Sequence, residues 1–193
     1  MKNKGIIFVI SGPSGSGKTT LVKNVLHDKV LRRKLVHSVS LTTRPKRSCE
    51  RNKKDYFFVT AEQFKKQLKQ KKILEWTRYL GYYYATPKGP VDEQLRGGKS
   101  VVLCLDLNGA RRIRQLYPKN NVTIFVKPPT LGVLTQRIQN RCHKTKALEI
   151  TKRLNLAKQE LLAARRYDYC LINRDLEHVT RELKDIILDN LRI

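Results

Sequence analysis

The sequence predicts an α/β domain with a mainly parallel core sheet, and three observations support this fold class. Short apolar runs rich in β-branched residues recur along the chain, as expected of strands buried on both faces. Stretches in which apolar residues follow helical spacing alternate with these runs. The first apolar run leads into a glycine-rich loop and then a helix, and parallel sheets bind ligands at such strand ends.

Each core element is predicted from its own apolar pattern. Strands are expected at four continuous apolar runs, residues 5–10, 100–105, 122–126 and 169–172. Amphipathic helices are expected at residues 21–26, 91–95, 108–116, 131–140, 144–166 and 176–191. The longest of these helices carries a regular apolar face, formed by Ile150, Leu154, Ala157 and Leu161.

Residues 37–88 depart from this alternation and predict an inserted, strand-rich subdomain. Its strands are expected around residues 39–41, 56–59, 73–76 and 82–84. A helix is predicted to begin after Thr60, because Gln63 can complete a capping box with it. Phe64 and Leu68 are expected on the inner face of that helix.

The charge of the chain narrows the classes of partner. Its 193 residues carry 41 lysines and arginines against 16 acidic residues, a formal net charge of +25. This favours an anionic partner, that is nucleic acid, an acidic surface or a phosphorylated small molecule. A solvated lysine-rich surface is the alternative, since the basic residues are spread along the whole chain. No helix-turn-helix, RNP or KH pattern occurs, so no specific nucleic-acid partner is expected.

Membrane segments and protein-held metals are not expected. No apolar run approaches the roughly 20 residues that a membrane span needs. The basic start of the chain leads into a glycine loop rather than a cleavage site, so we expect a cytoplasmic protein. The four cysteines and four histidines lack metal-ligand spacing.

The glycine loop predicts a nucleotide triphosphate site, because Gly12-x-x-x-x-Gly17-Lys18-Thr19 fits the Walker A pattern. Backbone N–H groups can surround phosphate oxygens, and the following helix adds the positive end of its dipole. Lys18 can reach the β- and γ-phosphates, and the Thr19 hydroxyl can join a Mg²⁺ shell. The residues expected to hold ATP here are Gly12, Pro13, Ser14, Gly15, Ser16, Gly17, Lys18, Thr19 and Thr20.

The loop alone leaves the fate of the γ-phosphate open. Transfer to water would make the protein an NTPase, and transfer to a second substrate would make it a kinase. A switch GTPase should also carry an Asn-Lys-x-Asp motif, which is absent. Asp106 ends a core strand, where a Mg²⁺-organising carboxylate is expected.

A second phosphate site is predicted in the basic turn after residue 40. Arg44 and Arg47 lie three apart, and a pair of guanidinium forks can clamp a monophosphate. Tyr56 can donate its hydroxyl to the same phosphate. Among apolar neighbours, the Glu75 carboxylate is a good acceptor for the N1–H and exocyclic amine of guanine.

The hydroxyls of Ser40 and Thr86 could read the O6 face of such a base. Taken together with the motifs above, these residues show that the chain from about residue 5 to 190 resembles the guanylate kinase family. The motifs that carry the resemblance are the glycine loop, Ser38-Val39-Ser40-Leu41-Thr42-Thr43-Arg44 with Arg47, Asp55-Tyr56-Phe57-Phe58, Leu74-Glu75, Tyr83-Tyr84-Ala85-Thr86, Asp106 with Gly109, Pro128-Pro129, Arg137 with Arg141, Arg153-Leu154 with Glu160, Tyr167-Asp168 and Asn173.

The resemblance implies a P-loop nucleoside monophosphate kinase fold with three parts. The core would comprise residues 1–36, 98–130 and 165–193, the GMP-binding subdomain about 37–90, and a helical lid about 131–160. The implied reaction transfers the γ-phosphate of ATP to GMP or dGMP with Mg²⁺. The residues implied to hold GMP are Ser40, Arg44, Arg47, Tyr56, Glu75, Tyr84 and Thr86.

The resemblance also assigns the remaining charged residues. Lys18, Arg137, Arg141 and Arg153 would stabilise the transferring phosphoryl group. Thr19 and Asp106 would organise Mg²⁺, and Asn173 would flank the adenine of ATP.

Other functions stay open at this point. One is a catalytically weak, guanylate-kinase-like protein-interaction module, although the intact glycine loop argues against it. Another is a related P-loop kinase for a different phosphorylated small molecule, although Glu75 with Ser40 favours guanine. The sequence is compatible with a monomer or a homodimer.

The chain departs from the family pattern at several positions. Cys104 replaces an aspartate, Cys49 and Lys53 replace glycines, and Ala85 replaces a glycine of the guanine pocket. Residues 142–148 are basic where the family is usually acidic. A replaced glycine that needs a positive φ would be strained. We expect an active enzyme whose turnover these departures could slow.

Overall fold

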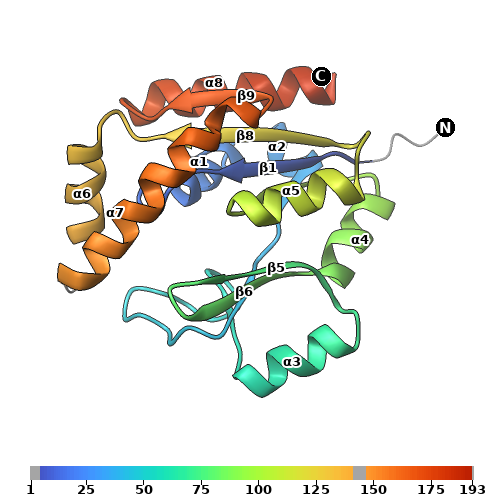
Figure 1. Cartoon of the computed structure of the whole chain (residues 1–193). Coiled ribbons are helices and arrows are strands. Elements are labelled where there is room, and N and C mark those ends of the chain that lie inside the picture. The colour runs from blue at the N-terminus through green and yellow to red at the C-terminus, as the bar shows by residue number, and fades with distance from the viewer. Residues whose placement is uncertain (1–4, 141–146, 193) are drawn as a thin grey trace.

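The computed structural model describes residues 5–140 and 147–192 and contains two sheets (Figure 1). The larger is a five-stranded parallel sheet with the order β2-β7-β1-β8-β9. This confirms the predicted α/β class with a mainly parallel core sheet. The strands are β1 Ile7–Ser11, β2 Leu35–His37, β7 Ser100–Cys104, β8 Asn121–Lys127 and β9 Tyr169–Ile172.

The core lies on both faces of this sheet, because successive residues of β1 point to opposite sides. Phe8 and Ile10 pack with α1 and α8, whereas Ile7 and Val9 pack with α4 and α5. All four side chains are fully buried. Packing of helices on both faces of the sheet holds the carboxyl end of β1 in place, and the glycine loop begins there. The covering helices are α1 Lys18–Leu26, α4 Lys88–Arg96, α5 Leu107–Leu116 and α8 Leu176–Leu191.

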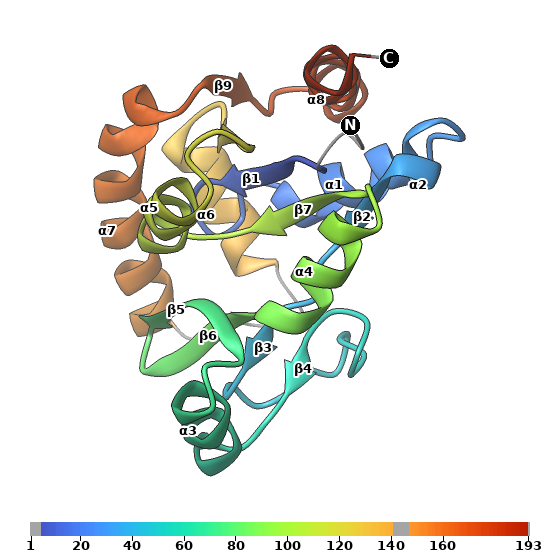
Figure 2. The same ribbon diagram turned by 90° about the vertical axis from the view of Figure 1, so that its right-hand side faces the viewer.

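The second sheet is smaller and mainly antiparallel, with the order β4-β3-β6-β5. Helix α3 (Ala61–Lys69) covers its outer face, with Phe64 packed on Leu41 and Ala85. Figure 2 shows this sheet and α3 below the core sheet, with α4 reaching between them. Its strands are β3 Leu41–Thr42, β4 Phe57–Phe58, β5 Ile73–Tyr79 and β6 Tyr82–Pro87.

Two further helices pack together beside the core. Leu134 and Ile138 of α6 (Leu131–Gln139) pack on Ala157 of α7 (Ala147–Leu162). In both views α7 runs from the core sheet toward the β5–β6 hairpin (Figures 1 and 2). The other short elements are α2 Leu31–Lys34 and a 3₁₀ turn, η1 Ala163–Arg166. No helix within the described ranges is long and apolar enough to cross a membrane.

Several expectations about elements were wrong. Val39 lies in a connection between β2 and β3 rather than in a strand. The three-residue β2 and the one-turn α2 before it were not predicted, because neither is long enough to show a period. The expected strand at 169–172 exists, but it forms an edge of the sheet and exposes Tyr169 and Ile172.

The inner face of α3 is narrower than its sequence predicts. The capping box of Thr60 with Gln63 is confirmed, since each side chain bonds the other residue's backbone N–H. Phe64 is buried, but Leu68 is 37% exposed, which corrects the expectation that both face inward. The helix contacts the small sheet around Phe64, and one turn later it has passed beyond the packed area.

Candidate functional site

A cavity of about 520 Å³ lies at the carboxyl end of the core sheet. The glycine loop, the second sheet and helices α6 and α7 all contribute to its walls. It therefore brings together elements that lie far apart in the sequence. The predicted site residues among its walls are Gly12, Ser14, Gly15, Gly17, Lys18, Thr19, Thr20, Ser40, Arg44, Arg47, Tyr56, Glu75, Tyr84, Asp106, Arg137, Arg153 and Asn173.

The glycine loop opens directly into helix α1. Gly17 precedes the helix with φ 99°, and no side chain caps the helix. A Cβ at Gly17 would lie 2.2 Å from Nδ2 of Asn173, so the position has no room for a side chain. The uncapped N–H groups of α1 are thus available to an anion in the cavity.

Lys18 bends back over this loop. Its Nζ donates to the carbonyl oxygens of Gly12 at 2.6 Å and Pro13 at 2.9 Å. The ammonium is therefore held beside the loop that would carry the phosphates. Pro13 and Ser16 belong to the loop but are buried and do not line the cavity, which corrects their prediction as cavity residues.

Asn173 braces the loop from the end of β9. It is 3% exposed, and its Nδ2 donates to the Ser16 carbonyl oxygen at 2.8 Å. Arg137 of α6 donates from Nη2 to the Asn173 carbonyl oxygen at 3.3 Å. The second terminal nitrogen of Arg137 is buried and has no hydrogen-bond partner among the described residues. This arginine thus keeps a donor available in a cavity wall.

Arg153 brings α7 onto the glycine loop. Its Nη1 donates to Oγ of Ser14 at 2.6 Å, and its Nε donates to Oε1 of Glu149 at 3.0 Å. The side chain is 6% exposed. The fourth predicted charge-stabilising residue, Arg141, lies outside the described residues.

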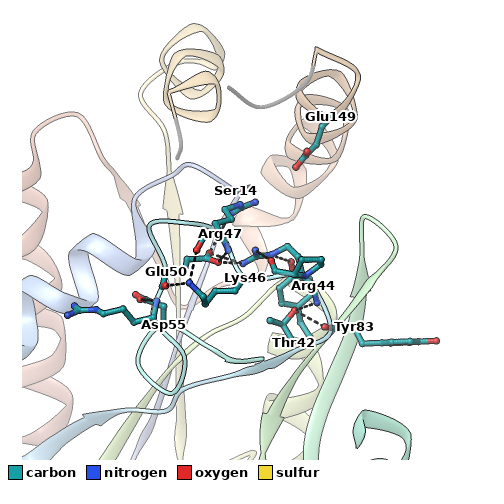
Figure 3. A network of polar contacts seen from close by, with 12 residues as sticks. Ser14, Thr42, Arg44, Lys46, Arg47, Glu50, Asp55, Tyr83 and Glu149 are labelled. Carbon is teal, nitrogen blue, oxygen red and sulfur yellow. Dashed lines mark hydrogen bonds and ion pairs between the residues drawn. The ribbon is translucent and has the colours of Figure 1, made fainter. Parts of the chain in front are cut away.

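The two predicted clamp arginines converge on Glu50 (Figure 3). Arg44 donates from Nη2 to both carboxylate oxygens of Glu50, at 2.7 and 3.0 Å. Glu50 also accepts the backbone N–H of Arg47 at 3.0 Å, and Nη1 of Arg47 lies 3.5 Å from its Oε1. Burial opposes ionisation, but these bonds hold the pKa of Glu50 below its usual range.

Aromatic rings complete the surroundings of Arg44. Its Nε donates to Oη of Tyr84 at 3.1 Å, and its guanidinium lies 5.6 Å from the Tyr56 ring centroid. Tyr56 and Tyr84 meet edge to face at 5.9 Å. Sequence reasoning missed Glu50, although it is the one acidic residue in the basic run 44–54. That isolation was the available signal, because a buried arginine pair needs a compensating charge.

Glu75 and Thr86 pair across strands β5 and β6. Thr86 donates from Oγ1 to Oε1 of Glu75 at 2.5 Å. Both are buried, Glu75 at 5% exposure, and Thr86 does not itself line the cavity. A Cβ at Gly109 would lie 2.7 Å from Oε2 of Glu75, so a glycine there makes room for the carboxylate.

The charge state of Glu75 is perturbed. Burial raises its pKa to about 7; the Thr86 hydrogen bond opposes the rise, and the nearby Asp106 carboxylate adds to it. Glu75 is therefore partly protonated near neutral pH. A donor-rich ligand would favour the ionised form.

Asp106 and Thr19 offer oxygen atoms to the same cavity. Asp106 caps α5 by accepting the Gly109 N–H at 2.9 Å. Burial raises the pKa of the neighbouring Cys104 thiol to about 11, so Cys104 supplies no charge where the family has an aspartate. The described residues hold no cluster of three or more His, Cys, Asp or Glu that could bind a metal. The Thr19 and Asp106 oxygens suit Mg²⁺, which keeps most of its shell as water and phosphate.

Three cavity residues that carry a hydroxyl or carboxyl group had no role from sequence reasoning. Thr77 and Tyr79 follow Glu75 on the same face of β5, and Glu160 comes from α7. One buried oxygen of Glu160 has no hydrogen-bond partner in the described part of the chain. The period of two from Glu75 could have identified Thr77 and Tyr79.

Comparison with known protein families gives one match over most of the chain. A family model described as guanylate kinase matches residues 4–190. Among curated relatives, the guanylate kinase of Lactobacillus delbrueckii subsp. bulgaricus is 41% identical over 97% of this chain and 90% of its own length. That of Synechocystis sp. is 40% identical over 95% of this chain and 94% of its own.

A solved structure agrees with these sequence relatives. The crystal structure of guanylate kinase from Anaplasma phagocytophilum superposes with a TM-score of 0.78 at 28% identity. The match covers 98% of this chain and 88% of the other. The likeness therefore extends over both sheets of this chain.

Proposed function

The chain belongs to the guanylate kinase family, and we propose that the cavity between its two sheets is where its two nucleotides meet. As a guanylate kinase it transfers a phosphoryl group from ATP to GMP, giving ADP and GDP. The observation that carries the proposed site is a juxtaposition. The glycine loop and the Arg44–Arg47 pair, two anion-binding elements from different parts of the chain, line one cavity.

The donor nucleotide would occupy the glycine-loop side. The N–H groups at the start of α1 and the Lys18 ammonium would surround the phosphates of ATP. Asn173 would support this loop through Ser16 and flank the adenine. Mg²⁺ bound with ATP would neutralise charge on its phosphates, with the oxygens of Thr19 and Asp106 available to hold it.

The acceptor phosphate would occupy the arginine side. Arg44 and Arg47 carry two positive charges, and Tyr84 and Tyr56 add hydroxyl groups beside them. Glu50 holds both arginines in place, which lowers the entropy lost when a phosphate binds. Two arginines and one ionised glutamate leave the clamp with one net positive charge, and its several donors suit a monophosphate.

The base of the acceptor would meet Glu75. An ionised carboxylate accepts both the N1–H and the exocyclic amine of guanine, a pattern that adenine and the pyrimidines do not offer. Thr86 orients the carboxylate rather than the base, since its hydroxyl is committed to Glu75. Ser40, at the cavity wall, would read the remaining edge.

The chemistry then needs little from the protein beyond position and charge. The phosphate oxygen of GMP is already a nucleophile near neutral pH, so no protein base is required. Lys18, Arg137, Arg153 and, by family resemblance, Arg141 would neutralise the charge of the transferring group. Closure of the cavity walls around both nucleotides would exclude water, which could otherwise accept the phosphoryl group.

We also propose the division of the chain that the family implies. The core would be residues 1–36, 98–130 and 165–193, the GMP-binding subdomain about 37–90 and the lid about 131–160. One chain lines the whole cavity, so a monomer would suffice and a homodimer would not add to the site. The substrates are cytoplasmic metabolites, which supports a cytoplasmic location.

The test is a coupled assay of ADP release with ATP, Mg²⁺ and each nucleoside monophosphate. GMP and dGMP should support release, whereas AMP, CMP and UMP should not. Arg44→Ala should reduce the rate with GMP by about a hundredfold, because it removes a charged fork from the clamp. Arg111→Ala, an exposed arginine on α5, is the matched control. No GMP-dependent release at millimolar GMP would refute the proposed site and activity together.

A further inference from the structure

We propose that Tyr79 is a positioning residue that couples the GMP clamp to the ATP loop. The inference rests on the proposed function, because it assumes that both nucleotides occupy the cavity. Tyr79 ends β5 in the second sheet, one residue before the hairpin turn. Its ring reaches the cavity beside Ser14 of the glycine loop. It is thus a residue of the second sheet placed against a loop of the core.

On the core side, Tyr79 meets the donor machinery. Tyr79 and Ser14 both line the cavity, and a side-chain hydrogen bond with Ser14 acts to lower the pKa of Tyr79. Ser14 Oγ in turn accepts Nη1 of Arg153 at 2.6 Å. One serine therefore joins the second sheet, the glycine loop and helix α7.

On the acceptor side, Tyr79 meets the clamp. Its ring packs edge to face on Tyr84, with centroids 6.3 Å apart and an interplanar angle of 80°. The Tyr84 hydroxyl accepts Nε of Arg44 at 3.1 Å. A continuous line of contacts then runs from Arg44 through Tyr84 and Tyr79 to Ser14.

The hydroxyl of Tyr79 stays protonated at neutral pH. Burial raises its pKa to about 12, the Arg153 guanidinium opposes the rise, and Glu160 and Tyr84 add to it. Arg153 and Glu160 face it from α7, and Tyr84 faces it from β6. A neutral phenol both donates and accepts, so it can keep its bond to Ser14 while phosphates fill the cavity.

A contact between two parts of a site couples the ligands that each part binds. A nucleotide that holds the second sheet in place also holds Tyr79 against Ser14, so the other nucleotide finds its loop already ordered. One such hydrogen bond corresponds to about a twofold to tenfold change in affinity. The packing of the Tyr79 ring on Tyr84 does not depend on the Tyr79 hydroxyl. A variant that lacks only the hydroxyl therefore isolates the contribution of the hydrogen bond to Ser14.

The experiment uses the full chain with Tyr79→Phe, which keeps the ring and removes the hydroxyl. GMP affinity is measured by calorimetry with and without a saturating, non-hydrolysable ATP analogue and Mg²⁺. In the parent the analogue should tighten GMP binding. Tyr79→Phe should reduce that tightening by about twofold to tenfold, with GMP affinity in the absence of analogue unchanged within about twofold. The turnover number of Tyr79→Phe should fall by a similar factor, and its melting temperature should equal that of the parent.

Tyr82→Phe is the matched control, because Tyr82 pairs with Tyr79 across the hairpin and is 39% exposed. It should behave as the parent in every measurement. Ser14→Ala combined with Tyr79→Phe should lose no more coupling than the worse single variant, since both remove the same bond. Additive losses would overturn the inference.

Three further results would overturn it. They are parent-like coupling in Tyr79→Phe, no response of parent GMP binding to the analogue, and a loss of GMP affinity in Tyr79→Phe without the analogue. The last would make Tyr79 a direct GMP contact. A parent chain that binds no GMP at all would instead refute the proposed function, and with it the premise of this inference.

Discussion

At the residue scale, the proposed site assigns the choice of base to Glu75. The side chain is buried, so the carboxyl must ionise without full hydration in order to accept hydrogen bonds from guanine. Because its pKa is about 7, GMP binding to the ionised carboxylate should release a proton below that pH. GMP affinity should therefore rise from pH 5 to about 7 and then level off, a trend that calorimetry in buffers of different ionisation enthalpy would detect.

Glu75→Gln separates the base-reading role from the fold. The amide has the same shape but cannot accept two hydrogen bonds from guanine, so GMP affinity should fall about tenfold to a hundredfold. ATP-analogue affinity should not change, because the glycine loop lies elsewhere in the cavity. Glu93→Gln, an exposed glutamate on α4, is the control. Equal losses of GMP and ATP affinity would contradict the assigned role.

The same carboxyl has a consequence for stability. Its folded-state pKa lies above the ordinary value of 4.5, so the folded state holds the proton more tightly than the unfolded chain. Stability should then decrease as pH rises from 4.5 to about 7. Glu75→Gln removes this pH dependence. In thermal unfolding, the melting temperature of the variant should therefore rise relative to that of the parent between pH 5 and pH 8. If the difference in melting temperature between variant and parent did not change with pH, this would argue against a raised pKa of Glu75.

At the element scale, the β5–β6 hairpin has an unusual turn. Leu80 and Gly81 both have positive φ, 49° and 87°, between the paired residues Tyr79 and Tyr82. Such two-residue turns favour Asn-Gly, because asparagine tolerates this backbone region better than leucine. Leu80→Asn should raise the free energy of unfolding by about 0.5–1 kcal/mol in urea titrations. The side chain of Leu80 is half-buried, which limits the gain.

Leu80→Val provides the opposite test at this turn. A β-branched residue is more strongly disfavoured at positive φ, so this variant should be less stable than the parent. Equal stability of the asparagine and valine variants would show that the turn relaxes without cost. Because Tyr79 precedes the turn, the asparagine variant should retain full GMP phosphorylation.

How far elements are predictable depends on their length and surroundings. The apolar runs at β1, β7 and β8 were identified because both faces are buried and every residue is apolar or nearly so. Strand β2 was not identified, because its three residues are too few to show a periodic apolar pattern. Lys53, which replaces a family glycine, does adopt a positive φ of 64°, as its position suggested. Cys49 does not share this backbone conformation.

Site residues were predictable where a motif carries them. The glycine loop, the arginine pair and Glu75 line one cavity, and each belongs to a local pattern with a chemical reason. Tyr79 was missed because its importance comes from a contact across the fold. Glu50 was missed although its arginine partners lie only six and three positions earlier in the chain. Glu50 matters through both arginines, and Tyr79 through a serine more than sixty positions earlier in the chain.

At the scale of the whole molecule, two kinds of positive charge have different tasks. The clamp arginines are compensated by Glu50, with Arg44 only 9% exposed. Most of the net charge of +25 must therefore reside on lysines and arginines outside the cavity. Exposed Lys65, Lys66 and Lys69 on α3 exemplify this second kind. Catalysis and surface charge should consequently be separable by mutation and by salt.

The surface charge predicts non-specific binding to polyanions. Single-stranded poly(U) should bind at about 50 mM salt and weaken at least about tenfold by about 200 mM, since released counterions drive such binding. Poly(A) should bind equally, because phosphates rather than bases are contacted. Arg44→Ala should reduce GMP phosphorylation by about a hundredfold and keep poly(U) binding. A triple α3 variant, Lys65→Gln, Lys66→Gln and Lys69→Gln, should keep GMP phosphorylation and bind poly(U) more weakly, because it removes three of the charges spread over the surface. If Arg44→Ala also lost the polynucleotide, as measured by fluorescence anisotropy, the nucleotide cavity and the polyanion surface would be one site, and the separation argued from the burial of Arg44 would be wrong.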